Sequence, residues 1–279
     1  MILEESIPIE SVHSLLTNKI KTFFKQAGMS KAVVGLSGGI DSAVVATLAV
    51  DALGKRNVHG ILMPSEFSTF HSVSDSVELA ANLGIKHSVV SIENIYSRFM
   101  IELKEFFELG KWHVAQENLQ ARIRGTILMA YANKFNALVL NTSNKSELST
   151  GYGTLYGDLA GAAMVIADLY KLQVYELAGY INSKSVRIPK NIITKAPSAE
   201  LRPGQVDSDS LPEYKILDPV LHALNDEHKS AEELISAGYN KTLIDRIIKL
   251  RKGAAFKGLQ VPPVMTVCGT PLVPEYKCI

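Results

Sequence analysis

A chain of 279 residues with 47% hydrophobic content can bury a full core, and one α/β domain with helical additions is the simplest arrangement for it. A formal net charge of +1 excludes strong long-range attraction to nucleic acid or acidic membranes, so the expected partner is a small molecule. The two cysteines, Cys268 and Cys278, indicate neither a disulfide framework nor a zinc site and are interpreted as incidental thiols.

The N-terminus and the apolar stretches argue against secretion and against membrane insertion. Residues 1–10 carry acidic side chains where a secretory signal would carry basic ones. The longest apolar stretch, within residues 43–53, contains Asp51 and is far too short to span a bilayer. We therefore predict a soluble, cytoplasmic protein.

In chain order, helix-like and strand-like patterns alternate, which is typical of parallel βαβ units. The predicted helices cover residues 11–27, 40–53, 72–82, 96–109, 115–134 and 172–181, with more helix within about 218–252. The predicted strands cover residues 32–36, 58–63, 87–92 and 137–141. The fold class that this order predicts is α/β, a doubly wound, Rossmann-like parallel sheet with added C-terminal helices. The tail from Leu259 is interrupted by prolines and predicts no function.

The most informative segment is Ser37-Gly38-Gly39-Ile40-Asp41-Ser42, which directly follows the strand ending in Gly35 and Leu36. Its glycines allow a tight turn and a close approach of ligand to backbone. The helix predicted from Ile40 presents free N–H groups and a positive dipole end, which favour anionic oxygens. The serines add hydroxyl donors, and Asp41 adds a carboxylate suited to Mg²⁺. The segment therefore predicts a phosphate-binding loop.

This loop differs from the common P-loop, because no lysine follows its glycines to contact the β- and γ-phosphates. It resembles the pyrophosphate loop of the ATP pyrophosphatases, which cleave ATP between the α- and β-phosphates and transfer AMP to a substrate oxygen. An ordinary glycine–serine turn before a helix is the structural alternative. The length of the match, placed between a strand and a helix, argues against that alternative.

A second polar stretch, residues 141–158, follows the fourth predicted strand and is rich in hydroxyls, amides and glycines. A solvated surface loop is the alternative interpretation. Ligands of open parallel sheets bind beyond the carboxyl ends of the strands, so residues 37–42, 64–68 and 142–147 are expected around one crevice. Asp41 and Glu147 would both lie there, and two carboxylates suit a metal with oxygen ligands.

These motifs, in their order along the chain, resemble the NAD synthetases, and in detail the synthetase half of the glutamine-dependent members. The resemblance covers about residues 11–257. It rests on the phosphate loop, Glu117-Asn118-Leu119-Gln120-Ala121-Arg122-Ile123-Arg124, Thr142 with Asn144-Lys145-Ser146-Glu147, Tyr156-Gly157-Asp158, and residues 195–205. The fold it implies is that of the adenine nucleotide alpha-hydrolase-like proteins.

The resemblance also implies roles for individual residues. ATP would contact Gly35, Leu36, Ser37, Gly38, Gly39, Ile40, Asp41, Ser42, Thr142, Lys171 and Ser198. Asp41 and Glu147 would coordinate Mg²⁺, and Asp41 and Lys171 would be catalytic. Arg122, Glu147 and Lys257 would contact the substrate deamido-NAD.

Each assignment has a simpler alternative. Arg122 and Arg124 lie in a predicted helix, where a solvated ion pair with Glu117 is the default. Lys171 could be a surface lysine at the start of a helix. Lys195 lies in a proline-flanked loop, where exposure is the ordinary expectation.

The implied enzyme is a ligase that forms a C–N bond, an ammonia-dependent NAD synthetase using ATP and Mg²⁺. The carboxylate of deamido-NAD would attack the α-phosphorus of ATP, and ammonia would then expel AMP from the acyl adenylate. Because water would hydrolyse this adenylate, the site should close over it. Residues 192–209 are the segment expected to cover it and to become ordered when ATP binds.

Two features depart from the family. Glutamine-dependent members carry an amidase domain before the synthetase part, whereas this chain is expected to be one domain over residues 1–279 without it. Either free ammonia or a separate amidase subunit would supply the nitrogen, and the sequence leaves both open. Leu155 stands where ammonia-dependent members commonly place a lysine against the substrate. The family also implies a homodimer, for which residues 96–109 and 115–134 have enough apolar surface, although both segments could equally belong to the core.

Two other functions stay open at this stage. Another ATP pyrophosphatase, such as a GMP synthetase-like or tRNA-modifying enzyme, would share residues 37–42, although the tRNA enzymes usually need a basic surface. A non-catalytic nucleotide-binding module would also share the loop. Such a module would have little use for a metal pair at Asp41 and Glu147, so magnesium-dependent release of pyrophosphate would separate the two.

Overall fold

The computed structural model describes residues 7–107, 111–267, 272–274 and 277–279. Its centre is a parallel sheet of five strands in the order β3-β2-β1-β4-β5. The strands are β1 (Lys31–Gly35), β2 (Val58–Leu62), β3 (Lys86–Val89), β4 (Ala137–Asn141) and β5 (Ala163–Met164). Cys268 lies outside the described residues, so the interpretation of its thiol is not addressed by the structure.

The helices, in chain order, are α1 (Ile9–Gln26), α2 (Ile40–Leu53), α3 (Phe70–Leu83), α4 (Glu93–Glu102), α5 (Val114–Phe135), α6 (Lys145–Thr150), α7 (Lys171–Lys184), α8 (Lys190–Thr194), α9 (Tyr214–Asn225), α10 (Ala231–Ser236) and α11 (Lys241–Gly258). Short 3-10 helices occur at Lys55–Asn57, Lys104–Phe106 and Asp207–Asp209.

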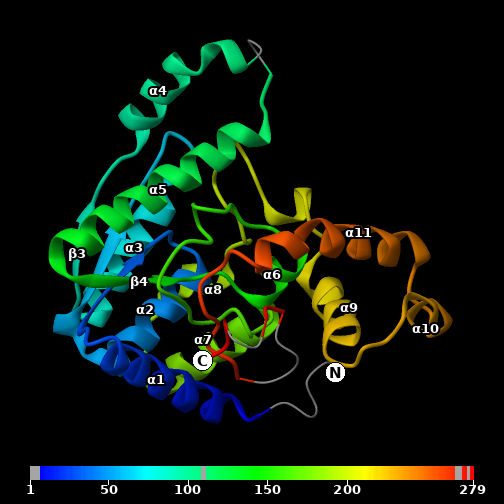
Figure 1. Ribbon diagram of the computed structural model, residues 1–279. Helices are drawn as coiled ribbons and strands as arrows, with labels where there is room; N and C mark the ends of the chain where they lie inside the picture. The colour runs from blue at the N-terminus through cyan, green and yellow to red at the C-terminus, as the bar shows by residue number, and fades with distance from the viewer. Residues whose placement is uncertain (1–6, 108–110, 268–271, 275–276) are drawn as a thin grey trace.

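Helices cover both faces of the sheet (Figure 1). Successive side chains of a strand point to opposite faces, and β1 shows the consequence. Val34 packs into the core formed with α1, α2, α3 and α7, whereas Val33 packs into the core under α4 and α5. The buried residues of this strand, Ala32, Val33 and Val34, are all apolar, as expected of a strand covered on both faces. The arrangement confirms the predicted doubly wound α/β fold.

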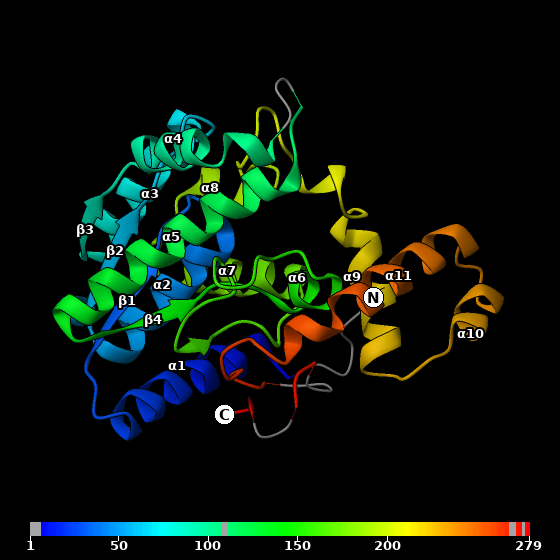
Figure 2. The ribbon, with the colours of Figure 1, turned by 45° about the horizontal axis from the view of Figure 1, so that its top comes forward.

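The C-terminal helices form a separate core beside the sheet. Leu217, Val220 and Leu221 of α9 pack with Leu234 of α10 and Ile247 of α11. Figure 2 shows these helices grouped on the side of α6, away from β3. The predicted helical addition is confirmed, although it begins earlier, at Tyr214, and reaches Gly258.

Several boundaries differ from the predicted ones. β3 ends at Val89 rather than at residue 92, because the chain turns there into α4, which already starts at Glu93. The predicted helix 96–109 ends at Glu102, and its last two predicted positions lie outside the described residues. α6 and β5 were missed because elements of six and two residues are too short to show a periodicity. Within the described part of the chain, no helix is long and apolar enough to cross a membrane.

Candidate functional site

A pocket of about 290 Å³ opens beyond the carboxyl ends of β1, β2 and β4. Residues of the three strand ends line it, together with side chains from α5, α7 and residues 195–201. The strand order therefore brings the predicted loops around one crevice, as expected. Most positions predicted to contact ATP lie in its lining: Gly35, Leu36, Ser37, Gly39, Ile40, Asp41, Ser42, Thr142, Lys171 and Ser198.

The phosphate loop has the compact form that its glycines allow. Gly38 has a φ of +76°, and a Cβ there would lie 2.5 Å from the carbonyl oxygen of Ser72. Gly38 therefore packs against the start of α3 and does not itself line the pocket. Ser42 Oγ donates to the carbonyl oxygen of Gly39 at 3.0 Å and accepts from the N–H of Ser37 at 3.3 Å. The turn leaves the first amides of α2 at the pocket, where they suit anionic oxygens.

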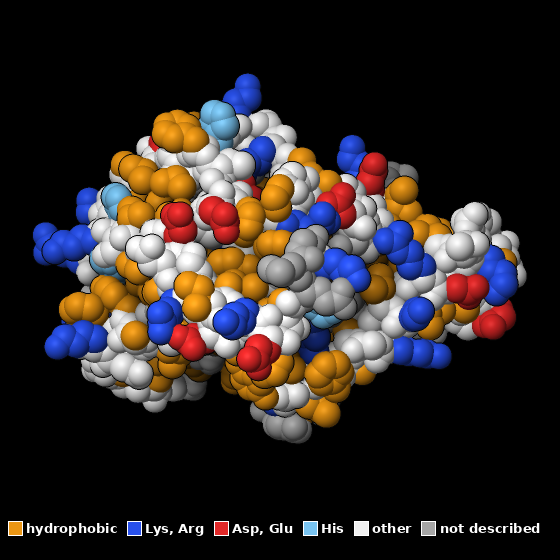
Figure 3. Space-filling view, turned by 90° about the horizontal axis from the view of Figure 1, so that it is seen from above, with side chains coloured by type: hydrophobic (Ala, Val, Ile, Leu, Met, Phe, Trp, Pro, Cys, Tyr) orange, Lys and Arg blue, Asp and Glu red, His pale blue; other side chains and the backbone are white. Residues whose placement is uncertain are grey.

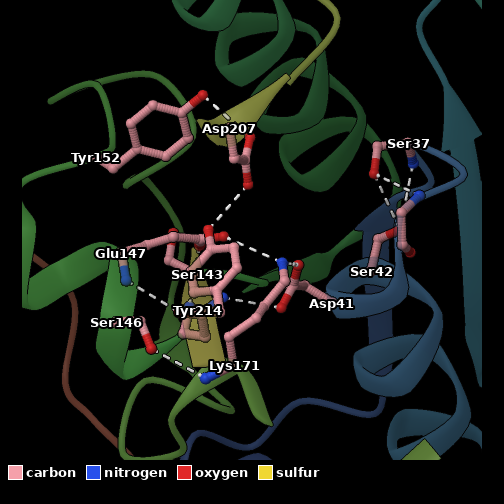
Figure 4. Close-up of polar contacts among 12 residues, drawn as sticks. Ser37, Asp41, Ser42, Ser143, Ser146, Glu147, Tyr152, Lys171, Asp207 and Tyr214 are labelled. Atoms are coloured by element: carbon pink, nitrogen blue, oxygen red, sulfur yellow. Dashed lines mark hydrogen bonds and ion pairs between the residues drawn. The ribbon is translucent and has the colours of Figure 1, made fainter. Parts of the chain in front are cut away.

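Lys171, Asp41 and Glu147 form a charged centre at the end of this loop (Figure 4). The Lys171 ammonium donates to Asp41 Oδ2 and lies 3.5 Å from Glu147 Oε1. Its side chain is only 3% exposed, so the interpretation of Lys171 as a surface lysine is wrong. The Nδ2 group of Asn144 donates to the other oxygen of Asp41 at 3.0 Å, which fixes that carboxylate.

The pKa values of Glu147 and Lys171 are both raised in this centre. Burial raises the pKa of Glu147, and the nearby charge of Asp41 raises it further, while Lys171 opposes both. Burial acts to lower the pKa of Lys171, but the charges of Asp41 and Glu147 raise it overall. Two carboxylates contact one ammonium here, so Lys171 alone does not neutralise the negative charge of the pair.

A cation with oxygen ligands would relieve this excess of negative charge. No group of three or more His, Cys, Asp or Glu side chains among the described residues is arranged to hold a metal alone. Asp41 and Glu147 instead form a pair, and Mg²⁺ commonly takes one or two carboxylates together with substrate phosphates. The donor set thus fits a magnesium ion that arrives with a nucleotide.

Two helix starts hold the charged centre in place. α6 begins with a capping box, in which Asn144 Oδ1 accepts from the N–H of Glu147 at 2.9 Å and Glu147 Oε2 accepts from the N–H of Asn144. α7 begins at Lys171, whose N–H donates to Ser146 Oγ at 2.9 Å. The capping box fixes Glu147 at the start of α6, and the bond from Lys171 to Ser146 holds the start of α7 against α6. Glu147 and Lys171 therefore lie side by side.

Asp218 of α9, far along the chain, accepts a hydrogen bond from the first turn of α7 and holds it against α6. It accepts hydrogen bonds from Ser146 Oγ at 2.6 Å and from the N–H of Leu172 at 2.9 Å, and it is 1% exposed. Sequence reasoning missed this residue. The available signal was an acidic side chain among the apolar positions Tyr214, Leu217 and Leu221 of one helix face, which is unusual without a buried partner.

Of the predicted covering segment, residues 192–209, the pocket lining includes Ile192, residues 195–201 and Asp207. Glu200 accepts hydrogen bonds from Ser72 Oγ at 2.7 Å and from the hydroxyl and N–H of Thr69, at the start of α3. Lys195 Nζ donates to Ser72 Oγ at 3.0 Å and lies 3.3 Å from Asp75, so it is paired and not simply exposed. Ser198 lines the pocket, although its hydroxyl donates to the carbonyl oxygen of Gln205 within the segment.

The same segment brings another acid towards the charged centre. Asp207 accepts hydrogen bonds from the hydroxyls of Tyr152 at 3.1 Å and Tyr214 at 2.9 Å, and it is 6% exposed (Figure 4). Its charge acts to raise the pKa of Glu147. Sequence reasoning included Asp207 in the covering segment but assigned it no role.

Two predicted substrate contacts lie outside the pocket lining. Arg122 is exposed, and its Nε donates to the carbonyl oxygen of Leu155 at 3.2 Å. Lys257 Nζ donates to the carbonyl oxygens of Gly151 at 2.8 Å and Gly153 at 2.5 Å. Both therefore attach to the loop after α6, and their contact with a substrate stays a prediction.

Neither Arg122 nor Arg124 forms the surface ion pair with Glu117 that was the simpler alternative. Glu117 accepts hydrogen bonds from Trp112 and Gln205 and lies 3.5 Å from Arg202. Arg124, further along α5, is partly buried and lines the pocket. Its Nε donates to the carbonyl oxygen of Met63 at 3.0 Å.

The fold and the site define a parallel α/β protein with a glycine-rich loop for anionic ligands at the ends of its strands. The family model described as NAD synthase matches residues 12–262. The chain belongs to the NAD synthase family, and the predicted resemblance is confirmed.

Three similar proteins place the chain more closely. It is 46% identical over 261 residues to a glutamine-dependent NAD(+) synthetase of Synechocystis, a match that covers 94% of this chain but 47% of that protein. The structure of a glutamine-dependent NAD+ synthetase from Acinetobacter baumannii in complex with ADP matches with 36% identity and a TM-score of 0.66, over 97% of this chain and 50% of the other. An NH3-dependent NAD synthetase from Campylobacter jejuni matches with 33% identity and a TM-score of 0.74, over 91% and 97%. The chain thus spans about half the length of the glutamine-dependent relatives.

Proposed function

We propose that this chain amidates deamido-NAD to NAD at the expense of ATP, with ammonia as the nitrogen donor and AMP and pyrophosphate as products. The observation that carries the proposal is the Asp41–Lys171–Glu147 centre, which lies at the end of a glycine loop in a family of NAD synthases. The complex of a relative with ADP supports an adenine nucleotide as the ligand of the pocket.

ATP would bind with its phosphates on residues 37–42. The amides and hydroxyls there suit the terminal phosphates, and Lys171 would neutralise the charge that develops on the leaving pyrophosphate. Asp41 and Glu147 would hold Mg²⁺, which when bound would neutralise phosphate charge as a Lewis acid. Thr142 and Ser198 would contact the nucleotide from β4 and from the covering segment.

The chemistry would proceed in two displacements. An oxygen of the substrate carboxylate forms a bond to the α-phosphorus as the bond to pyrophosphate breaks. Ammonia then adds to the activated carbonyl, loses a proton and expels AMP with its bonding electrons. Neither step requires a side-chain nucleophile, so positioning and charge neutralisation are what the pocket must provide.

The nitrogen source and the partners are part of the proposal. A similar protein of nearly the same extent is NH3-dependent, which supports free ammonia, whereas the glutamine-dependent relatives are about twice as long. A separate amidase subunit that delivers ammonia is the alternative. The expected homodimer would use α4, the 3-10 helix that follows it and α5, where several large apolar side chains are exposed: Ile95, Phe99, Ile101, Phe106 and Met129. Figure 3, which views the molecule from above, shows hydrophobic side chains on this side of the molecule, interspersed with polar and charged ones.

The test is NAD formation by the purified protein with deamido-NAD, Mg²⁺-ATP and either ammonium or glutamine. Activity with ammonium that is lost in Asp41→Ala is expected. Activity with glutamine only when an amidase is added would identify the partner-fed form. If neither donor yields NAD, the proposal is wrong, and pyrophosphate release with other acceptors would be measured next.

A further inference from the structure

The pocket is lined by three cationic side chains, and two of them already have carboxylate partners. Lys171 contacts Asp41 and Glu147, and Lys195 lies 3.3 Å from Asp75. Arg124 differs from both. Among the described residues it forms one hydrogen bond, from Nε to the carbonyl oxygen of Met63, and no ion pair.

An arginine in this position is unusual on energetic grounds. Burial lowers the pKa of Arg124 to about 10, although the charges of Asp158 and Glu200 favour the cation. The carboxylates of Asp158 and Glu200 accept hydrogen bonds elsewhere, from Thr154 and from Thr69 with Ser72. Partly buried charges are usually paired, so the two terminal nitrogens of Arg124 are available for an anion that the chain does not supply.

The place of Arg124 in the fold shows from which side such an anion would come. Arg124 belongs to α5, which packs on one face of the sheet, whereas the phosphate loop opens α2 on the opposite face. Both reach the pocket at the strand ends, so the loop and Arg124 flank it from opposite sides. Ala121, Gly125 and Leu128, the neighbours of Arg124 on α5, also line this side and carry no charge.

The reaction requires this separation. In phosphoryl and adenylyl displacement, the attacking and leaving oxygens lie roughly in line on either side of the phosphorus. With the leaving pyrophosphate on the loop at α2, the attacking carboxylate must approach from the side of α5. A guanidinium presents paired donors that match the geometry of a carboxylate.

From this arrangement we propose that Arg124 binds the carboxylate of the substrate that attacks ATP and so distinguishes the acid substrate from its amide product. The inference rests on the proposed function and assigns the residue that selects the substrate. Arg124 positions the nucleophile opposite the leaving group and, once the amide has formed, has no anion to hold, which favours product release.

The experiment measures equilibrium binding of deamido-NAD and of NAD, which differ only in the carboxylate, to the ADP-loaded protein. The unmodified protein is expected to prefer the acid by about 10- to 100-fold, the range for a charge-assisted hydrogen-bonded pair. Arg124→Gln should reduce this ratio to near one and change the affinity for ADP less than twofold. Arg124→Lys, which keeps the charge but not the paired donors, should retain part of the preference.

Arg251→Gln is the matched control. Arg251 is also a partly buried arginine whose pKa is lowered by burial, but it donates to Asn225 in the helical addition and lies outside the pocket. Its substitution should leave the acid-to-amide ratio unchanged. An unchanged ratio in Arg124→Gln would overturn the inference, as would a loss of ADP affinity equal to the loss of acid affinity.

A second measurement uses the unsubstituted protein, in case Arg124→Gln does not fold. Phenylglyoxal modifies accessible guanidinium groups, and peptide mass spectrometry reports the extent of modification at Arg124. Protection by deamido-NAD but not by NAD is expected, and equal protection by both would refute the inference.

The two proposals can fail separately. If the protein makes NAD but Arg124→Gln keeps the preference for the acid, only the inference about Arg124 fails. If it binds neither dinucleotide and makes no NAD, the proposed function fails as well.

Discussion

The two walls of the pocket are built in different ways. The phosphate loop lies within one strand–loop–helix unit, and its internal hydrogen bonds join positions no more than five apart. The wall around Lys171 and Asp207 is assembled from distant segments, since Lys171 reaches Asp41 of the loop across 130 positions and Asp207 reaches Tyr152 across 55. The local wall depends on backbone shape, whereas the assembled wall depends on buried polar contacts. Substitutions in the two walls should therefore have different effects, on the affinity for nucleotide in the loop and on the rate of the reaction around Lys171.

The largest effect is expected at the assembled wall, with Lys171→Met. Methionine has a similar length but no charge, so Asp41 and Glu147 would face each other and the developing pyrophosphate without neutralisation. We expect kcat for NAD formation to fall by about 10³-fold. Lys184→Met, at the other end of the same helix, is the control. A rate within tenfold of the unsubstituted protein would show that Lys171 has no catalytic role.

On the local wall, Gly38→Ala should act through geometry. Its Cβ would lie 2.5 Å from the Ser72 carbonyl oxygen, so the loop must move away from α3. We expect the affinity for ADP, measured by calorimetry, to fall by about 10²-fold, because the donors of the loop no longer converge. Gly28→Ala is the control. Gly28 also has a positive φ, +65°, but an added Cβ there would meet nothing within 4 Å, so this substitution introduces backbone strain without a steric clash. Equal effects of the two substitutions on binding would contradict this explanation.

A smaller effect is expected from Asp218→Asn, which tests how the assembled wall is held. An amide cannot accept from both Ser146 and Leu172 as the carboxylate does, so the start of α7 should loosen. We expect kcat to fall about tenfold with little change in the KM for ATP. Ser146→Ala should give a similar loss, and the double variant should lose no more than Asp218→Asn alone. Val220→Ala removes core packing in the same helix without touching these contacts, and equal losses there would indicate general destabilisation.

The same residue predicts a dependence of stability on pH. Burial raises the pKa of Asp218 from 3.8 to about 6, with hydrogen bonds from Ser146 and Leu172 opposing. Between these values the folded protein retains a proton that the unfolded chain has released, so this group makes stability fall as the pH rises from 3.8 to about 6. Unfolding in urea at several pH values should show this fall, and it should be smaller in Asp218→Asn, where only other buried carboxyls such as Glu147 contribute. Parallel pH profiles for the two proteins would contradict it.

The smallest effect is expected at the edge of the covering segment, with Glu200→Gln. The amide would keep part of the hydrogen bonding to Thr69 and Ser72 but would lose the charge that strengthens it. Opening of the segment should let water reach the adenylate, so AMP formed per NAD should rise about two- to fivefold. The ratio of the two products reports this directly. An unchanged ratio would mean that Glu200 does not hold the segment closed during turnover.

The contrast between the walls also explains what the sequence could predict. The tight turn at residues 37–42 and its place at the pocket were predictable, because a contiguous motif between a strand and a helix encodes its own geometry, whereas phosphate binding there stays a prediction. Asp41 and Glu147 were correctly placed at one crevice, because strand order brings the carboxyl ends of parallel strands together. The partners of Asp218 and the orientation of Arg124 were not predictable, since each depends on which segments pack side by side across a long stretch of chain.

The contact between Lys171 and Asp41 has a further consequence for how activity arises during folding. Contacts between positions so far apart form late, because much of the chain must be ordered before the two groups can meet. The phosphate loop, in contrast, can take shape as soon as β1 and α2 pair. The loop that would hold phosphate is therefore expected to form before the charged centre that would act on it.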